Sequence, residues 1–382
     1  MLNMNNDEAI GIIFPNSYDN LIPELVTERL MASIPFAGRY RVCDFIISSM
    51  VHSGIDNISL IVKKNYHSLM DHLGSGQEFD LARKNGGLNI VPPYAQKQIQ
   101  VYSGRIEALE SLKGYLQKCS QKYVILSDAN LIFNFDFREL IEEHKRSGAD
   151  DTVMYYKDEI PKAFTRPNSN NSELYYTLDV EDGRVKKIYI NPKVGGKTNF
   201  CMNIHIMERE KLIRLIDDAY VHGLSYFTRD LLAQNTDTLN IHAYEYTGYV
   251  SQITDMQSYF KENMKLLNEE NRNALFSNGN SIYTKIRDDN PTRYISGAKA
   301  KNVMVADGCV IEGEVENSVI FRGVKVGKGA KIKNCILLQD TVVEEGAVME
   351  YVITDKNVRI TKNKSLTGNE SFQVYVAKGQ SV

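Results

Sequence analysis

The chain has 382 residues and a mass of 43.4 kDa, more than one small hydrophobic core usually organises, so two domains are expected. A formal net charge of −3 gives no positive field for nucleic acid. The five cysteines form no C-x-x-C pair, which argues against a disulfide framework or a zinc site. MLNMNNDEAIG lacks a signal-peptide pattern, and 18 apolar residues never occur in a row. We therefore expect a cytoplasmic protein that binds neither nucleic acid nor membranes.

The first two-thirds of the chain alternates short apolar runs with segments of helical period. Buried strands are predicted at Ala9–Phe14, Asn57–Val62, Tyr123–Leu126 and Thr152–Tyr156, and helices at Tyr40–Val51, Ile106–Leu116 and Phe137–Arg146. This alternation is typical of an α/β fold with a mostly parallel sheet covered on both faces. Glu181-Asp182-Gly183, between two apolar runs, predicts a hairpin turn, so the sheet is expected to be mixed.

From about Ala298 the pattern changes, and apolar residues recur at steps of six. These positions are Val305, Ile311, Val326, Ile332, Val343 and Met349. A period of six predicts a left-handed parallel β-helix, in which each hexapeptide forms one face of a triangular coil. Between Tyr283 and Val382 there is no histidine to act as an acyltransferase base, so we expect this region to serve assembly and regulation. The predicted organisation is an α/β domain over 1–270, a polar linker over 271–297 and the β-helix over 298–382.

The loop after the first strand is where an α/β nucleotide-binding fold grips phosphate. Such loops are usually rich in glycine, because only glycine lets backbone N–H groups close on an anion without a Cβ in the way. Here the loop is PNSYDN, Pro15–Asn20, and contains no glycine. The loop alone leaves two interpretations open: a nucleotide site that has been lost, or a loop that never held a nucleotide.

Three strings carry a resemblance to a known family. They are IPFAGRYRVCDF (Ile34–Phe45), GSGQEFDLARKNGGLNIVPPY (Gly74–Tyr94) and HKRSGAD (His144–Asp150). They are similar to VPFGGKYRIIDF, GNGQPWDLDRxNGGVxxLPPY and HKEKGAD of the sugar-phosphate nucleotidyltransferases, and most closely of the bacterial glucose-1-phosphate adenylyltransferases. The resemblance covers nearly the whole chain and implies a nucleotidyltransferase-like domain followed by the β-helix. The family's reaction, ATP with glucose-1-phosphate, needs cations for the phosphates and carboxylates for Mg²⁺.

The positions that would bind phosphate have lost the residues that this chemistry requires. The family's GGxGxRL aligns with Asn16–Ile22, which puts Asp19 in place of a glycine and Leu21 in place of the arginine. The lysine of the family's AKPAVPF becomes Met31, and the lysine of its EKP becomes Asn191. Under this alignment the first loop is a converted nucleotide site.

Both metal carboxylates are also missing. The aspartate of the family's SGDH aligns with Ala129, and that of its GYWxDVG aligns with Gln252, whose neutral amide is a poor Mg²⁺ ligand. Asp128 lies one residue early, and on a strand this step points it to the opposite face. We therefore expect no catalytic residue, metal or cofactor in this chain, with Mg²⁺ held by a catalytic partner.

Several residues remain that suit an anionic ligand. The resemblance places Arg29, Arg39 and Arg41 where the family binds anionic effectors, and Arg229 keeps the cation of the family's FGKD. The full set predicted to bind residual nucleotide, sugar phosphate or effector is Arg29, Arg39, Arg41, Tyr102, Asp128 and Arg229.

The resemblance implies a non-catalytic or weakly catalytic regulatory subunit of a heteromeric glucose-1-phosphate adenylyltransferase in glycogen biosynthesis. Its expected partners are the catalytic subunit, in a homo- or hetero-oligomer such as a tetramer, and an anionic small-molecule effector. Two alternatives remain open. One is an active nucleotidyltransferase that recruits Asp128 and Arg229 as substitute ligands, and the other is a free-standing sugar-phosphate or nucleotide sensor.

Overall fold

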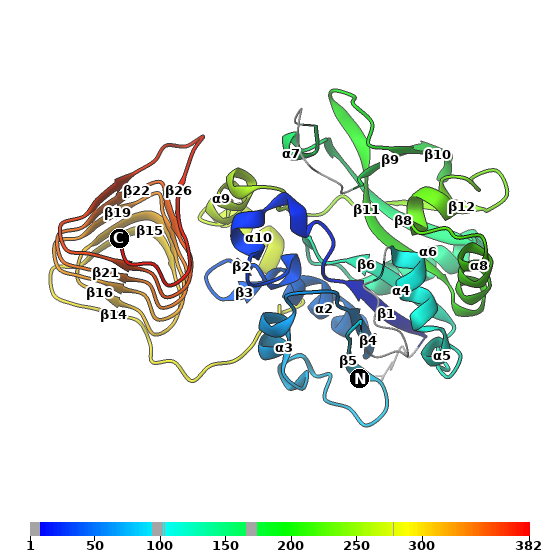
Figure 1. The fold of residues 1–382 in the computed structure, drawn as a ribbon, viewed down its shortest axis with the longest axis horizontal. Coiled ribbons are helices and arrows are strands. Elements are labelled where there is room, and N and C mark those ends of the chain that lie inside the picture. Colours follow the sequence, from blue (N-terminus) through cyan, green and yellow to red (C-terminus); the bar gives the residue numbers. More distant parts are fainter. Residues whose placement is uncertain (1–7, 94–101, 103, 166–173, 278) are drawn as a thin grey trace.

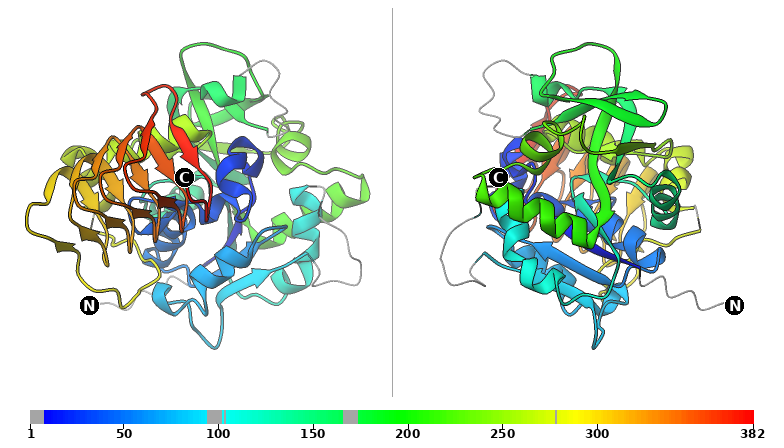
Figure 2. Two further views of the ribbon diagram at one scale, coloured as in Figure 1. Left: turned by 60° about the vertical axis from the view of Figure 1, so that its left-hand side comes forward. Right: turned by 90° about the vertical axis from the view of Figure 1, so that its right-hand side faces the viewer.

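The computed structural model describes residues 8–93, 102, 104–165, 174–277 and 279–382. These residues form an α/β domain and a β-helix that lie side by side (Figures 1 and 2). Within them, no helix combines the length and apolar character needed to cross a membrane.

A nine-stranded sheet lies at the centre of the α/β domain, in the order β5-β4-β1-β6-β11-β8-β12-β10-β9. Its strands are β1 (Ala9–Phe14), β4 (Asn57–Ile61), β5 (Gly87–Val91), β6 (Tyr123–Asp128), β8 (Asp151–Glu159), β9 (Tyr176–Glu181), β10 (Arg184–Ile190), β11 (Lys197–Glu208) and β12 (Ile241–Glu245). Only β10 and β11 run opposite to the other strands of this sheet. The predicted mixed, mostly parallel sheet is therefore confirmed.

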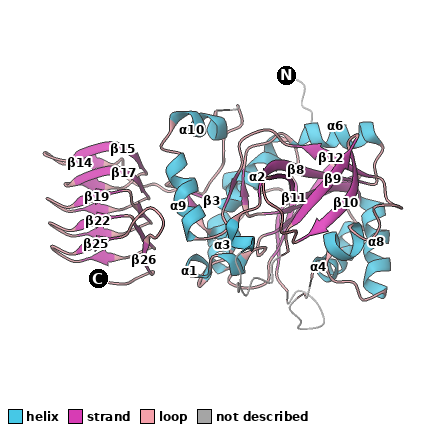
Figure 3. Ribbon diagram, turned by 90° about the horizontal axis from the view of Figure 1, so that it is seen from above, coloured by secondary structure: helices cyan, strands magenta, loops and turns pink. Residues whose placement is uncertain are grey.

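Helices cover both faces of this sheet (Figure 3). The helices of the described residues are α1 (Pro23–Val26), α2 (Val42–His52), α3 (His67–Leu73), α4 (Arg105–Ser111), α5 (Lys113–Leu116), α6 (Phe137–Ser147), α7 (Lys162–Thr165), α8 (Arg209–Val221), α9 (Met256–Lys265) and α10 (Glu269–Phe276). Successive residues of β1 enter different cores: Ile13 packs in one core with Phe45 of α2, and Ile12 in another with Leu212 of α8. This explains the continuous apolar run of β1, since a strand covered on both faces has no solvent side.

The predicted hairpin joins β9 to β10. Asp182 and Gly183, at its tip, have φ angles of 51° and 74°. Two successive residues with positive φ are what a tight two-residue hairpin turn requires. The Asp-Gly pair therefore encodes this turn locally.

The C-terminal part of the chain is a parallel β-helix. Its strands are β14 (Arg293–Tyr294), β15 (Lys299–Val305), β16 (Val310–Ile311), β17 (Glu314–Ile320), β18 (Lys325–Val326), β19 (Lys331–Lys333), β20 (Ile336–Leu337), β21 (Val342–Val343), β22 (Val348–Glu350), β23 (Val352–Thr354), β24 (Arg359–Ile360), β25 (Ser365–Thr367) and β26 (Val374–Val376). Val326 pairs with Val343, and Ile332 with Met349, so these apolar positions stack in successive coils. All four side chains are buried inside the coil, which confirms the prediction from the six-residue period.

Corners of the coil repeat a backbone conformation. Asn317, Asn334 and Tyr351 have φ angles of 44°, 50° and 51°. Asparagine tolerates this left-handed region better than most residues. The asparagines at these corners therefore help to set the turns of the β-helix.

The segment 271–297, predicted as a linker, holds most of α10 and also β14, which is the first strand of the β-helix. The chain between them packs on both domains. The backbone N–H of Tyr283 donates to Ser48 Oγ of α2, and Arg322 of the β-helix donates to the carbonyl oxygen of Lys285. This segment is therefore fixed at both of its sides.

The two domains meet through apolar side chains that surround one buried ion pair. Phe260 of α9 packs on Tyr351 of the β-helix, with ring centroids 6.0 Å apart. Arg29 Nη2 donates to both carboxylate oxygens of Asp355, at 2.7 and 2.9 Å, and each side chain is 4% exposed. The hydroxyl of Tyr375 also donates to this carboxylate, at 3.0 Å. The pair fixes the start of the α/β domain to the β-helix.

Replacement of Asp355 tests this pair. Asp355→Ala leaves the buried Arg29 guanidinium without its counter-charge, so we expect the free energy of unfolding in urea to fall by about 3 to 5 kcal/mol. The matched control is Lys378→Ala, which removes an exposed ion pair with Glu28 across the same interface and should cost less than about 1 kcal/mol. The double variant Arg29→Met/Asp355→Ala should regain most of the unfolding free energy that Asp355→Ala loses. An equal cost for the two single variants would contradict this role.

Candidate functional site

A buried carboxylate closes the loop after β1. Asp19 accepts hydrogen bonds from the backbone N–H of Met31, at 2.7 Å, and from Asn16 Nδ2, at 2.8 Å. The Asn16 side-chain oxygen in turn accepts the backbone N–H of Lys63 at 2.7 Å. Burial of Asp19 raises its pKa to about 6. An internal carboxylate thus accepts an amide hydrogen beside a loop that, in the resembling family, binds phosphate.

The aligned positions of the phosphate-binding cations hold side chains that serve packing or local structure. Met31 is fully buried in the core, and Leu21 packs against that core. Asn191 pairs with Tyr175: its side-chain oxygen accepts the Tyr175 backbone N–H at 2.9 Å, and its own N–H donates to the Tyr175 carbonyl at 3.0 Å. A phosphate would meet no cation at Leu21, Met31 or Asn191.

Two short antiparallel strands, β7 (Leu131–Ile132) and β13 (Ser251–Gln252), connect the predicted metal positions. Gln252 lies opposite Leu131, which follows Ala129 by two residues. Ala129 is buried in the core, and Gln252 Oε1 accepts the Tyr156 hydroxyl at 3.1 Å. Neither position offers a carboxylate, so these residues do not fit the Mg²⁺ site of the resembling family.

Asp128 forms an ion pair with an arginine. Arg105 Nη2 donates to both of its carboxylate oxygens, at 2.5 and 2.6 Å, and Ser17 Oγ donates at 2.6 Å. The Arg105 guanidinium also lies over the Phe14 ring, 5.1 Å from its centroid. A cation seeking Asp128 would have to displace this guanidinium. Sequence analysis did not select Arg105: its position in GRIEAL was visible, but its partner, 23 residues away, followed from no local pattern.

Five aromatic side chains connect the loop with the metal position. This aromatic cluster consists of Tyr18, Tyr156, Phe164, Tyr175 and Phe200. Phe164 lies at its centre, with its ring centroid 5.8 Å from Tyr18, 4.8 Å from Tyr175 and 6.1 Å from Phe200. Tyr156 contacts Phe200 at 5.6 Å and donates to Gln252. The cluster therefore runs from the loop to Gln252 and fills the space between them.

A cavity of about 140 Å³ remains on the Arg105 side of the loop, lined in part by Tyr226 and Thr228. Arg229, predicted to bind phosphate, is engaged elsewhere: it donates to the Asp230 carboxylate and lies 3.9 Å from the ring centroid of Tyr226. Tyr102 is buried in the core beneath the sheet, and its hydroxyl has no hydrogen-bond partner among the described residues. The structure thus separates Arg229 and Tyr102 from the arginines near the β-helix.

Arg39 and Arg41 line a second cavity, between the two domains, with a volume of about 490 Å³. We call this cavity the anion pocket. Its charged lining residues are the cations Arg39, Arg41, Lys285, Arg287, Arg322, Lys356 and Lys378 and the carboxylate Asp71. Such an excess of positive charge from both domains favours a small anion. Arg29, the third arginine of the predicted effector set, is bound by Asp355 and does not line the cavity.

Burial strengthens the demand for a counter-charge in the anion pocket. Arg322 is 7% exposed, and its Nε has no partner among the described residues. Burial lowers the pKa of both Arg41 and Arg322. The pKa of Lys356 falls to about 7, through burial first and then through the charges of Arg41 and Arg29. In each case the largest cause is burial, so each shift reports a cation that is largely removed from water.

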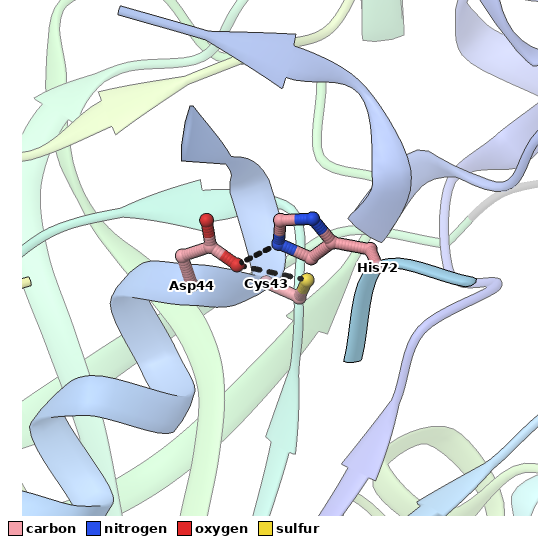
Figure 4. Close-up of side chains that lie close together, drawn as sticks. All are labelled: Cys43, Asp44 and His72. Carbon is pink, nitrogen blue, oxygen red and sulfur yellow. Dashed lines mark hydrogen bonds and ion pairs between the residues drawn. The ribbon is translucent and has the colours of Figure 1, made fainter. Parts of the chain in front are cut away.

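Beside this pocket, Cys43, Asp44 and His72 lie close together, as Figure 4 shows. Asp44 Oδ1 accepts from His72 Nε2 at 2.6 Å and from the Cys43 thiol at 3.6 Å. Its other oxygen accepts the Arg41 backbone N–H at 2.9 Å, which caps α2. Burial raises the pKa of Cys43, so the thiol stays protonated and is a poor metal ligand. The cluster instead holds Arg41 and α3 in place.

Comparisons with known proteins agree with this architecture. Residues 25–179 match the nucleotidyl transferase family, and residues 287–372 match the GlmU-like C-terminal hexapeptide family. The chain is 32% identical over 377 residues to the glycogen biosynthesis protein GlgD of Bacillus subtilis, covering 98% of this chain and 97% of that protein. It is 34% identical over 328 residues to GlgD of Geobacillus stearothermophilus, covering 86% and 83%. A glucose-1-phosphate adenylyltransferase of Clostridium perfringens strain SM101 is 26% identical over 346 residues, covering 89% and 87%.

Asp19 predicts a pH dependence of stability. Its folded pKa of about 6 lies above the ordinary value of 3.8, so the folded state binds the proton more tightly than the unfolded state. The carboxyl therefore destabilises the fold above pH 6, and this cost is lost as the pH falls towards 4. Relative to Asp19→Asn, the unchanged chain should gain about 1 kcal/mol of unfolding free energy between pH 7.5 and pH 5. Urea denaturation at both pH values measures this, and a pH-independent difference would contradict it.

Proposed function

The chain belongs to the family of the glycogen biosynthesis protein GlgD, and we propose that it is a non-catalytic, regulatory subunit of a heteromeric glucose-1-phosphate adenylyltransferase. The reaction of that enzyme is the attack of glucose-1-phosphate on the α-phosphorus of ATP, with release of pyrophosphate. The observation that carries the proposal is the state of the site after β1. Its cation and metal positions hold apolar or neutral side chains and Asp128 is paired with Arg105, while a cavity of about 140 Å³ remains beside the loop and the surrounding fold is kept.

The polar side chains of this site have partners inside the protein. Asp19 binds the Met31 amide, and Gln252 binds the Tyr156 hydroxyl. The carboxylate nearest to the lost metal position, Asp128, is neutralised by Arg105. Phosphoryl transfer depends on cations and metal ions held in place around the phosphates. We therefore assign the chemistry, and the Mg²⁺ that neutralises phosphate charge when bound, to the catalytic partner.

The contacts of Asp128 and Arg229 count against an active enzyme with substitute ligands. Both would have to leave their present partners, Arg105 and Asp230. Their release would expose two further charges in the site, so several rearrangements would be needed together. A free-standing sensor requires no such rearrangement, and only an experiment with the catalytic chain separates it from a subunit.

Regulation would act through the anion pocket. Arg41 reaches the pocket from the α/β domain and Lys356 from the β-helix, so a single bound anion contacts both domains. Binding would offset the repulsion between cations across the interface and tighten the contact between the domains. In a heteromeric enzyme, this is a route by which a phosphate or sugar-phosphate effector biases the partner chain.

The first test is ADP-glucose formation from ATP and glucose-1-phosphate with Mg²⁺. The purified chain alone should give no turnover above background, because Leu21 and Met31 leave the triphosphate without cations. Mixed with the catalytic homologue from the same genome, it should change the rate or the response to effectors. Robust turnover by the isolated chain would contradict the loss of catalysis, and an unchanged rate and effector response in the mixture would favour the sensor.

The second test is the binding of inorganic phosphate by isothermal titration calorimetry. We expect the double variant Arg39→Gln/Arg322→Gln to bind phosphate at least about tenfold more weakly, since each lost charged hydrogen bond is worth about 1.5 to 3 kcal/mol. Arg229→Gln is the matched control, because that arginine is bound to Asp230 outside the pocket. This variant should bind phosphate with unchanged affinity. Equal affinities for all three proteins would place the anion elsewhere.

A further inference from the structure

Three lysines line the anion pocket, and they differ in their partners. Lys285 lies 3.3 Å from an Asp71 carboxylate oxygen, and Lys378 is paired with Glu28. Within the described part of the chain, the Lys356 side chain makes neither an ion pair nor a hydrogen bond. Lys356 is therefore chemically distinct from its two neighbours in the same cavity.

The carboxylate closest in sequence to Lys356 is already in use. Asp355 accepts from Arg29 through both oxygens, and it also accepts from the Tyr375 hydroxyl. The charges that act most strongly on Lys356 are those of Arg41 and Arg29, which repel an ammonium group. A lysine that is desolvated and placed beside other cations is present largely as the neutral amine, which is its nucleophilic form. The value of about 7 for the Lys356 pKa agrees with this geometry.

We propose that Lys356 is a site of covalent acylation by small acyl phosphates that bind in the anion pocket. The phosphate end of such a molecule carries the charge that the pocket lacks, and the acyl end carries an electrophilic carbon. This inference rests on the anion pocket proposed above, but it does not depend on a regulatory or a catalytic role of the chain.

The reaction needs no further reactant. The lone pair of the neutral Lys356 Nζ attacks the acyl carbon, a C–N bond forms, and the C–O bond to the phosphate breaks. The phosphate leaves with the electron pair of that bond, and the nitrogen gives up one proton to the leaving phosphate or to water. The products are an Nζ-acyl lysine and inorganic phosphate. Cations such as Arg39 and Arg41 would stabilise the charge that develops on the departing phosphate.

Acylation would change the pocket in two ways. It converts an amine that can be protonated into a neutral amide, and it places the acyl group inside a cavity of about 490 Å³. Both changes lower the affinity for a phosphate-bearing ligand. The modification would therefore compete with the reversible binding of an anion at the same place.

The experiment uses the full chain and acetyl phosphate at pH 7.5, with peptide mapping by mass spectrometry over time. Lys356 should be acetylated at least about tenfold faster than Lys285 and Lys378, because those two form ion pairs with Asp71 and Glu28. Excess inorganic phosphate should slow the reaction at Lys356 and leave the rates at exposed lysines outside the pocket unchanged. Arg39→Gln removes a half-exposed cation of the pocket. It should slow the acetylation of Lys356 and leave the rates at exposed lysines outside the pocket unchanged.

Lys356→Arg is the matched variant. It should lack the fast site, and calorimetry with inorganic phosphate on the unchanged chain measures anion binding independently of any modification. Equal rates at the three lysines, or a fast Lys356 that phosphate does not slow, would overturn the proposal. If phosphate binds to the unchanged chain but Lys356 stays unmodified, only the acylation fails. If calorimetry detects no phosphate binding, the anion pocket fails as well.

Discussion

The charge distribution at the domain interface depends on the buried ion pair between Arg29 and Asp355. A guanidinium that is out of water requires a carboxylate with good geometry, and Asp355 supplies both oxygens to it. The same carboxylate is then unable to neutralise the cations that the two domains bring together around it. Arg41 donates to Ser68, and Lys356 lines the cavity without an ion-pair partner among the described residues. The contact that fixes the β-helix to the α/β domain thus also creates the charge excess of the anion pocket.

The altered nucleotide site obeys the complementary rule that buried polar groups must be satisfied. A loop that binds phosphate leaves backbone N–H groups without an acceptor once the ligand is gone. In this chain, backbone carbonyls of Phe14 and Asn16 accept the loop N–H groups of Ser17 and Asp19. The Asp19 carboxylate accepts the N–H of Met31 beside the loop. The Asp19 side chain is itself buried, and its raised pKa is the consequence. Internal acceptors and aromatic packing explain how the fold stays closed at a site that in the resembling family is open to substrate.

Local patterns predicted what is local in this molecule. The first strand, the Asp182-Gly183 turn and the six-residue period each depend on residues close in sequence, and each has the predicted structure. The period of two along a strand also predicted that Asp128 points away from Ala129. Contacts between distant segments were not predictable in this way.

Arg29 shows most clearly that contacts between distant segments could not be predicted from local patterns. The resemblance placed it among effector ligands, but its partner Asp355 is 326 residues away in the other domain. Lys285, Arg322 and Lys356 were not selected either, because their positive charges are dispersed along the chain and converge only when the β-helix packs on α9. Even so, the absence of cations and carboxylates at Leu21, Met31, Ala129 and Gln252 was readable directly from residue type.

Charge balance shows where this protein can still respond to a ligand. In the altered site the charges are paired inside the molecule: Asp128 with Arg105, and Arg229 with Asp230. An incoming phosphate there would have to break an ion pair before it gained one. In the anion pocket an incoming phosphate breaks no pair with Lys356 and meets cations from two domains at once. At the domain interface a ligand therefore meets a lysine that has no ion-pair partner among the described residues, and it can also alter how the domains pack.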